Sequence, residues 1–312
     1  MFFRIFVFRA RFISCLACCL GGFALSQNIE AVSDAAGRTL IVSSRHAPFP
    51  HRARAGGHRY QNRYYAFRKH YADSSVLLYL APGARLDRPL PIVVYLHGWR
   101  NEIRRANREF RLVEQFKASA LPGLFVVPQL AREAEDSFGG RLEDAGGFDR
   151  LISDLLGQVA ALASRAHGEA HTIIPGEIIL AGHSGAYRPM AKIIAKPGAN
   201  NRLAQKIRTI FLFDGLYGFE GGFAQWLRSG EDRRFVAVHT RYTRSGVSRL
   251  SRRLAQAPAI AFTRDNDDDD LPDIARRPAT LLSSSGSHDE SVFGRRQFER
   301  LLRQAAVRIA GR

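Results

Sequence analysis

The chain has 312 residues, of which 46% are hydrophobic and 24% are charged, and this composition excludes an intrinsically disordered protein. Its 46 lysines and arginines outnumber its 29 aspartates and glutamates, which gives a formal net charge of +17. That charge suits an anionic polymer such as a cell-envelope polymer, but no nucleic-acid-binding motif accompanies the arginines, so nucleic acid is not expected as a partner.

The first 26 residues have the pattern of a secretory signal peptide. Several arginines precede the short apolar stretch FISCLACCLGGFAL, and residues 24–26 offer small side chains for cleavage. The mature chain would then contain no disulfide and no thiolate metal site, because every cysteine lies in this segment: Cys15, Cys18 and Cys19. We expect a periplasmic or secreted protein with no membrane span after cleavage. Retention of the segment as an anchor is the alternative.

Residues 27–62 are polar and rich in Arg, His, Gly and Pro, without periodicity, and they predict a flexible basic arm. We expect one α/β domain over residues 63–312. Its first part contains the segments RYYAFRKHY and SSVLLYLAPG, which predict two early strands. The apolar runs PIVVYLHGW and GLFVVPQL predict two more, with a mixed segment at 101–120 between them.

The second half of the chain alternates helices and strands. The segment GGFDRLISDLLGQVAALASRA has one apolar helical face, formed by Phe148, Leu151, Ile152, Leu155 and Leu156. The strands EIILAG, RTIFLF, RRFVAVHTRY and ATLLSSSG follow, separated by helical segments such as YRPMAKIIA and GFAQWLRSG, and the chain ends in the helix GRRQFERLLRQAAVRIAGR. This order predicts a mostly parallel central sheet flanked by helices on both faces.

An acidic run, RDNDDDD at 264–270, raises the question of a calcium site. It lacks the glycine and the closing glutamate of an EF-hand loop. We therefore predict a solvated loop and no metal site there.

The segment IILAGHSGAYRPM, residues 178–190, places a serine among small residues directly after an apolar run. Gly182, Gly185 and Ala186 leave room for a sharp turn from strand to helix that exposes Ser184 in a strained backbone conformation. A serine hydroxyl attacks poorly until a base removes its proton, so a nucleophile needs such a presentation and a neighbouring base. The alternative is a glycine-rich loop in which Ser184 caps the following helix.

Three pieces in this order resemble the α/β-hydrolase superfamily: YLHGW after an early strand, GHSGA after a central one and SHDES near the end. The resemblance covers residues 63–312, and it implies an α/β-hydrolase fold with Ser184 as nucleophile and His288 as base. It also implies an oxyanion hole made of the backbone amides of Trp99 and Gly185. Ala186 stands where the family pattern has its last glycine.

The acid of such a site lies between the serine and the histidine in the chain. Asp214 is our choice, because it follows the apolar run IFLF and thus lies at the carboxyl end of a strand, on the same edge as Ser184. The alternatives that stay open are His183 and His239 for the base, and Asp265 and Asp267 for the acid.

The loop PQLAREAEDSFGGRLEDAGGF follows a strand's carboxyl end and is expected to line the rim of the site. Substrate contacts are predicted for Arg100, Asp136 and Arg188, with Ser137 and Glu143 as further rim residues. The predicted function is an exported serine hydrolase that cleaves an ester, or an amide, of a small molecule or a polymer through an acyl-enzyme, without metal or organic cofactor. The alternatives are a binding protein for anionic envelope polymers and a cell-wall peptide amidase or peptidase.

Overall fold

The computed structural model describes residues 30–34, 37–167, 172–195, 201–257, 262–266 and 271–311. The predicted signal peptide lies outside these ranges, as do Asp267 and the rest of the acidic run to residue 270. Within the described ranges, no helix has both the length and the apolar character needed to cross a membrane.

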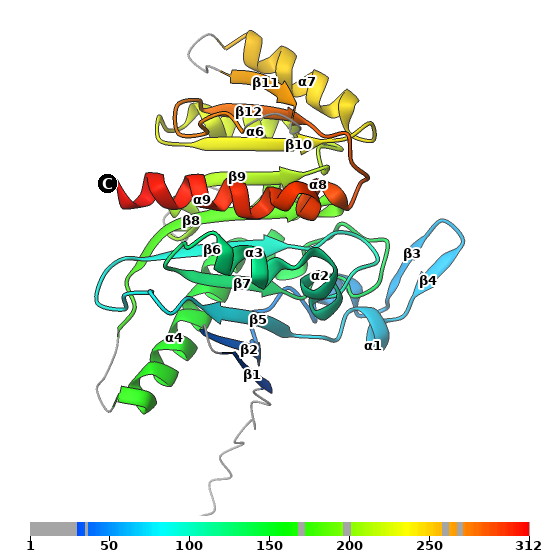
Figure 1. Cartoon of the computed structure of the whole chain (residues 1–312). Coiled ribbons are helices and arrows are strands. Elements are labelled where there is room, and N and C mark those ends of the chain that lie inside the picture. Colours follow the sequence, from blue (N-terminus) through cyan, green and yellow to red (C-terminus); the bar gives the residue numbers. More distant parts are fainter. Residues whose placement is uncertain are drawn as a thin grey trace, which may run out of the picture.

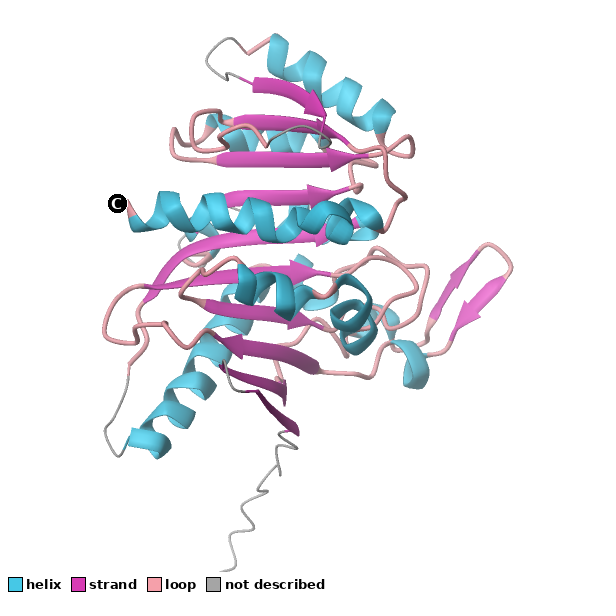
Figure 2. Cartoon of the chain, in the orientation of Figure 1, coloured by secondary structure: helices cyan, strands magenta, loops and turns pink. Residues whose placement is uncertain are grey.

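A sheet of ten strands, counted over the described residues, forms the centre of the fold in the order β1-β2-β5-β7-β6-β8-β9-β10-β12-β11 (Figures 1 and 2). The strands from β7 to β11 in this order are parallel, whereas β1, β2 and β5 form an antiparallel edge. Figure 2 shows the arrowheads of the parallel strands at one edge. The strands are β1 (Glu30–Asp34), β2 (Gly37–Ser43), β5 (Ser75–Leu80), β6 (Leu90–Leu96), β7 (Leu124–Pro128), β8 (Pro175–His183), β9 (Ile207–Phe213), β10 (Arg234–His239), β11 (Phe262–Asn266) and β12 (Ala279–Ser283).

Helices cover both faces of the sheet (Figure 1). One face packs against α4 (Gly147–His167), α5 (Tyr187–Ile194), α6 (Glu220–Arg228) and α7 (Arg244–Ala255). The other face packs against α2 (Ile103–Phe110), α3 (Leu112–Ala118), α8 (Glu290–Phe293) and α9 (Gln297–Ala310). The expected α/β architecture, a mostly parallel sheet between two helical layers, is confirmed.

The central strand β8 shows why such strands are continuous apolar runs. Ile178 and Leu180 point into the core under α4 and α5, and Ile179 and Ala181 point into the core under α9. Both faces of the strand are buried, so every position must be apolar. The carboxyl ends of the parallel strands are left as the edge where polar side chains can meet.

Residues 37–62 belong to the folded unit, which differs from the flexible arm expected over 27–62. Strand β2 pairs with β5, and Ala47 and Phe49 are completely buried. A small hairpin follows, with strands β3 (His58–Tyr60) and β4 (Arg63–Tyr65). The contacts that hold this region are distant in sequence, as between Arg54 and Asp136, and therefore leave no local periodicity.

One expected early strand also differs from the structure, and a segment without a predicted element forms helices. RYYAFRKHY forms β4 and the single helical turn α1 (Phe67–His70), which packs its aromatic residues against Phe49 and Ala134, whereas one long strand was expected. The mixed segment at 101–120 forms α2 and α3, separated at Arg111, whose backbone is left-handed with φ 52°.

Candidate active site

The turn after β8 has the strained backbone that the sequence predicts. Ser184 has φ 54°, in the left-handed region that non-glycine residues rarely occupy, and α5 begins three residues later. Ser184 is partly exposed rather than enclosed in the core. The turn thus lifts the serine out of the sheet at the carboxyl edge of β8.

Glycines on three segments make room for this turn. A Cβ on Gly98 would lie 2.8 Å from Ser184 Cβ, and one on Gly215 would lie 2.8 Å from the Ser184 carbonyl oxygen. A Cβ on Gly182 would lie 2.5 Å from Met190 Sδ. The loops after β6 and β9 therefore contact the serine turn so closely that only glycine fits.

His288 and Asp214 meet at the same edge of the sheet. His288 Nδ1 lies 2.6 Å from Asp214 Oδ2, although the two residues are separated by 74 positions in the chain. Asp214 is completely buried, and the side chain of His288 is 29% exposed. Asp214 accepts a hydrogen bond from His288 Nδ1. The other ring nitrogen, Nε2, therefore faces away from the carboxylate, as a general base requires.

Asp214 is held by three side chains. Thr240 donates to it from its backbone amide at 2.9 Å and from its hydroxyl at 2.5 Å, and Thr243 Oγ1 donates to Oδ1. Burial by itself raises the pKa of Asp214, but the hydrogen bonds from His288, Thr240 and Thr243 outweigh it and lower the pKa to about 2. The carboxylate is therefore charged at neutral pH.

His183, the residue before Ser184, contacts the backbone of His288. Its Nε2 lies 3.1 Å from the His288 carbonyl oxygen, and the two imidazole rings are 4.4 Å apart. Ser291 Oγ donates to the same carbonyl at 2.7 Å. Burial, and to a lesser extent His288, lowers the pKa of His183 to about 3, so this ring is neutral and donates its Nε2 proton to the carbonyl.

His183, His288 and Asp289 are also the group of described residues whose ligand atoms lie close enough to hold a metal, within 4.8 Å of one another. One nitrogen of each ring already has a partner, because His183 Nε2 binds the His288 carbonyl and His288 Nδ1 binds Asp214. Metal binding at these nitrogens would break both contacts.

The remaining alternatives lie elsewhere. His239 ends β10 and its Nδ1 is 3.5 Å from the Thr240 carbonyl oxygen. Asp265 lies in the edge strand β11, paired with Leu282.

The overall fold matches a known architecture. A feruloyl esterase module from Clostridium thermocellum, solved as a mutant in complex with sinapinate, superposes with a TM-score of 0.51 at 11% identity, covering 88% of this chain and 93% of that one. The chain has the α/β-hydrolase fold.

Two further structures are similar at lower scores. An S-formylglutathione hydrolase from Agrobacterium tumefaciens has a TM-score of 0.47 at 12% identity, covering 90% of this chain and 99% of that one. A fluorophosphonate-binding serine hydrolase from Staphylococcus aureus has a TM-score of 0.48 at 9% identity, covering 88% and 98%. No protein-family model and no curated protein sequence matches the chain.

In this α/β-hydrolase fold, the loop after β6 lies against the serine turn. The Trp99 indole packs on Gly185, where a Cβ would lie 2.5 Å from Trp99 Cδ1, and its Nε1 donates to Ser137 Oγ at 2.7 Å. Tyr60 of the β3–β4 hairpin packs edge-on against the same indole, with ring centroids 5.1 Å apart. The segments that carry the two expected oxyanion amides, Trp99 and Gly185, are therefore in contact.

The three residues predicted to contact the substrate, Arg100, Asp136 and Arg188, all form ion pairs. Asp136 is buried and accepts from Arg54 Nε at 2.6 Å, so it fastens the N-terminal region to the rim loop. Arg188 binds Glu143 through two hydrogen bonds of 2.9 and 3.0 Å. Arg100 pairs with the buried Glu135, but its side chain is 64% exposed beside Trp99. Of the three, Arg100 has the most side-chain surface available to a substrate.

Several residues near the site carry no local sequence signal. Thr240, Thr243 and Ser291 hold Asp214 and His288, and Tyr242 lies edge-on to His288 with ring centroids 5.8 Å apart. Single threonines and serines in loops are common, so only the fold reveals them. For Thr240, Tyr242 and Thr243, the position directly after strand β10 is the one hint, because strand ends meet at this edge.

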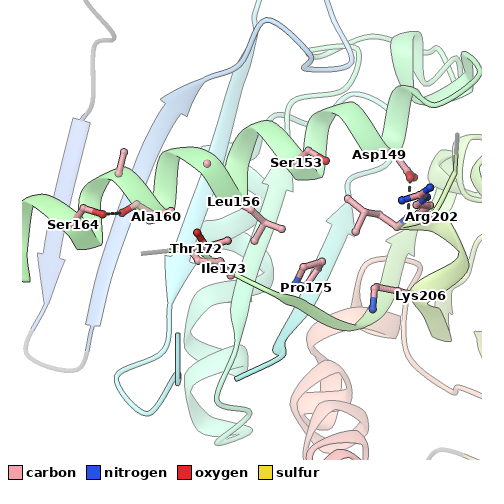
Figure 3. Close-up of a pocket in the computed structure, with 13 residues that line it drawn as sticks. Asp149, Ser153, Leu156, Ala160, Ser164, Thr172, Ile173, Pro175, Arg202 and Lys206 are labelled. Carbon is pink, nitrogen blue, oxygen red and sulfur yellow. Dashed lines mark hydrogen bonds between the residues drawn. The ribbon is translucent and has the colours of Figure 1, made fainter. Parts of the chain in front are cut away.

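A separate pocket lies at the opposite end of β8. It has a volume of about 820 Å³ between α4 and the chain entering β8, and Leu156, Ile173, Pro175 and Lys206 are among its lining residues (Figure 3). Pro175 and Ser184 stand at opposite ends of the same strand region. This pocket is therefore remote from the serine turn and plays no part in its chemistry.

Proposed function

We propose that the protein is a serine hydrolase that cleaves carboxylic esters through an acyl-enzyme, with Ser184 as nucleophile, His288 as base and Asp214 as acid. The observation that carries the proposal is the 2.6 Å contact between His288 and a fully buried Asp214, together with a serine held at φ 54° in the turn after β8. Such strain persists where the surrounding structure enforces it, and it is typical of functional sites.

In the first half of the reaction, His288 Nε2 takes the proton of the Ser184 hydroxyl as Oγ bonds to the acyl carbon. The ester bond between that carbon and the alcohol oxygen then breaks, and His288 returns the proton to the departing alcohol. In the second half, water attacks the acyl carbon, its proton passes through His288, and Ser184 Oγ leaves with that proton. The products are one alcohol and one carboxylic acid.

Asp214 fixes the imidazole tautomer and stabilises its protonated form during both halves. The backbone amides of Trp99 and Gly185 would bind the negative oxygen that develops on the acyl carbon, since donors of this kind each contribute about 2.7 to 4 kcal/mol. The close packing of Trp99 on Gly185 supports a shared position for the two amides. Arg100 is proposed to contact the substrate beyond them.

A substrate panel tests this proposal: p-nitrophenyl acetate, p-nitrophenyl palmitate and a peptide anilide. We expect ester hydrolysis that disappears in Ser184→Ala, and an acyl-enzyme visible by mass spectrometry after rapid acid quench. Hydrolysis of the peptide anilide without hydrolysis of either ester would indicate an amidase instead of an esterase. Ester hydrolysis unchanged in Ser184→Ala would contradict it.

Export to the periplasm or the medium is a further part of the proposal, supported by the sequence of residues 1–26. Secretion of the full-length chain, compared with a chain lacking these residues, tests it by the location of the protein and by the mass of its N-terminus.

A further inference from the structure

Exposed aromatic side chains gather around the serine turn. In the described part of the chain, five aromatic residues are exposed, and four of them follow the carboxyl ends of parallel strands: Trp99, Tyr217, Phe219 and Tyr242. Exposed apolar surface that collects at one place marks a binding site. Its position beside Ser184 indicates that the substrate covers it.

Tyr242 contacts the ring of His288, and Tyr217 lies in the loop after β9 that packs on the serine turn. The Tyr242 ring meets His288 edge-on at 5.8 Å. Tyr217 follows Gly215, which packs on the Ser184 backbone, and its ring lies 5.9 Å from that of Tyr187 at the start of α5, centroid to centroid. Trp99, in contrast, packs on Gly185 at the expected oxyanion side.

The chemistry assigns these two sides to different parts of an ester. His288 must hand its proton to the alcohol oxygen as the bond between that oxygen and the acyl carbon breaks. The alcohol therefore lies next to His288, against Tyr242 and Tyr217. The acyl oxygen lies on the opposite side, near the amides of Trp99 and Gly185.

We propose that Tyr242 and Tyr217 form the leaving-group subsite and that it takes a sugar ring, so that the substrate is an ester on a sugar hydroxyl. This inference rests on the proposed ester hydrolysis. A sugar ring has apolar C–H faces and hydroxyl groups at its edge. Tyr242 and Tyr217 are 53% and 44% exposed, and each offers a flat apolar ring for stacking and a phenolic hydroxyl for hydrogen bonds. A purely apolar alcohol would call for an enclosed apolar pocket instead.

Arg241 holds the Tyr242 ring in place. Its guanidinium carbon lies 5.0 Å from the ring centroid, and its NH2 group donates to the Tyr242 hydroxyl oxygen at 3.0 Å. A ring fixed in this way loses little rotational freedom when a ligand stacks on it. Tyr64 offers a matched control, because it is 52% exposed and carries Arg59 at 5.1 Å but lies on the β3–β4 hairpin.

The test compares esters that share an acetyl group and differ in the alcohol: ethyl acetate, phenyl acetate and an acetylated methyl glucoside. The full chain should prefer the sugar ester by kcat/KM. Tyr242→Ala should lower kcat/KM for the sugar ester about tenfold more than that for ethyl acetate, whose alcohol has no ring to stack on Tyr242. Tyr64→Ala should change neither.

Preference for phenyl acetate over the sugar ester, or an equal loss for all esters in Tyr242→Ala, would overturn the sugar subsite and leave ester hydrolysis standing. Binding of the acetylated glucoside to Ser184→Ala, measured by calorimetry with and without Tyr242→Ala, separates the two proposals. Binding that depends on Tyr242 in a protein that hydrolyses no ester would keep the subsite and refute the hydrolase.

Discussion

His183 donates a hydrogen bond from Nε2 to the backbone carbonyl oxygen of His288, at 3.1 Å. The residue next to the proposed nucleophile therefore holds the loop of the proposed base directly. Ser291 reaches the same carbonyl from α8, so the loop is fixed from both sides. A shift of the serine turn would carry the imidazole with it.

Removing the His183 donor should slow catalysis without weakening substrate binding. His183→Phe keeps a ring against His288 but has no N–H, and we expect kcat to fall about 10- to 100-fold, with KM unchanged, because a small misplacement of the base is costly. His183→Gln places an amide N–H at similar reach and should recover most of kcat. Steady-state kinetics on one nitrophenyl ester measures all three proteins.

His70 is the control for this change. It is also buried and its Nδ1 lies 2.7 Å from a backbone carbonyl, that of Arg132, but it does not touch His288. His70→Phe should lose stability and keep kcat. An equal fall of kcat in both Phe variants would show that His183 acts only through general stability.

Replacing Asp214 by Asn should lower kcat about 10³- to 10⁴-fold, because the amide cannot stabilise the protonated imidazole or enforce its tautomer. The lowered pKa of Asp214 also has a stability consequence. Its contribution is present above the ordinary carboxyl pKa of 3.8 and is lost as the pH falls toward about 2. Urea unfolding of both proteins between pH 7 and 2.5 should show a difference that shrinks only below about pH 4. A difference that stays constant to pH 2.5 would contradict this.

Two buried histidines should make the fold sensitive to mild acid. Burial lowers the pKa of His183 to about 3 and that of His97 to about 4, from an ordinary value of 6.5. The unfolded chain binds more protons below pH 6.5, so stability should fall as the pH drops from there toward 4, by about 1.4 kcal/mol per pH unit for each histidine. In urea unfolding, His183→Phe should reduce the slope of the unfolding free energy against pH by about 1.4 kcal/mol per pH unit. An unchanged slope would show that His183 is not the titrating group.

A methyl group at Gly98 should disturb the site, whereas one at Gly157 should not. At Gly98 it would lie 2.8 Å from Ser184 Cβ and 3.0 Å from the His183 carbonyl oxygen. We expect Gly98→Ala to cost about 1 to 3 kcal/mol and to lower kcat. Gly157 lies in α4 with open space around its Cα, so Gly157→Ala should stabilise by about 0.5 to 1 kcal/mol. Thermal unfolding and kcat of both variants check the contrast; equal kcat values would contradict it.

The sequence predicts the parts of this fold that depend on local pattern. The buried strands and amphipathic helices follow from apolar runs and helical spacing, and the turn at Ser184 follows from Gly182, Gly185 and Ala186. Asp214 could be chosen from its place after an apolar run, and the structure brings it to His288.

The rest depends on contacts between distant segments. Phe49 and Arg54 are single residues in a polar stretch, and only their partners Tyr71 and Asp136 explain why that stretch folds. The orientation of the His183 side chain cannot be predicted from local sequence either, because its contacts with Phe110 and with the His288 loop determine it.

Labelling by a fluorophosphonate tests most directly whether Ser184 is an activated nucleophile. We predict a single phosphonylated residue, Ser184, identified by peptide mass spectrometry, with labelling abolished in Ser184→Ala and strongly slowed in His288→Ala. No labelling of the folded protein, or labelling that persists in Ser184→Ala, would contradict the account.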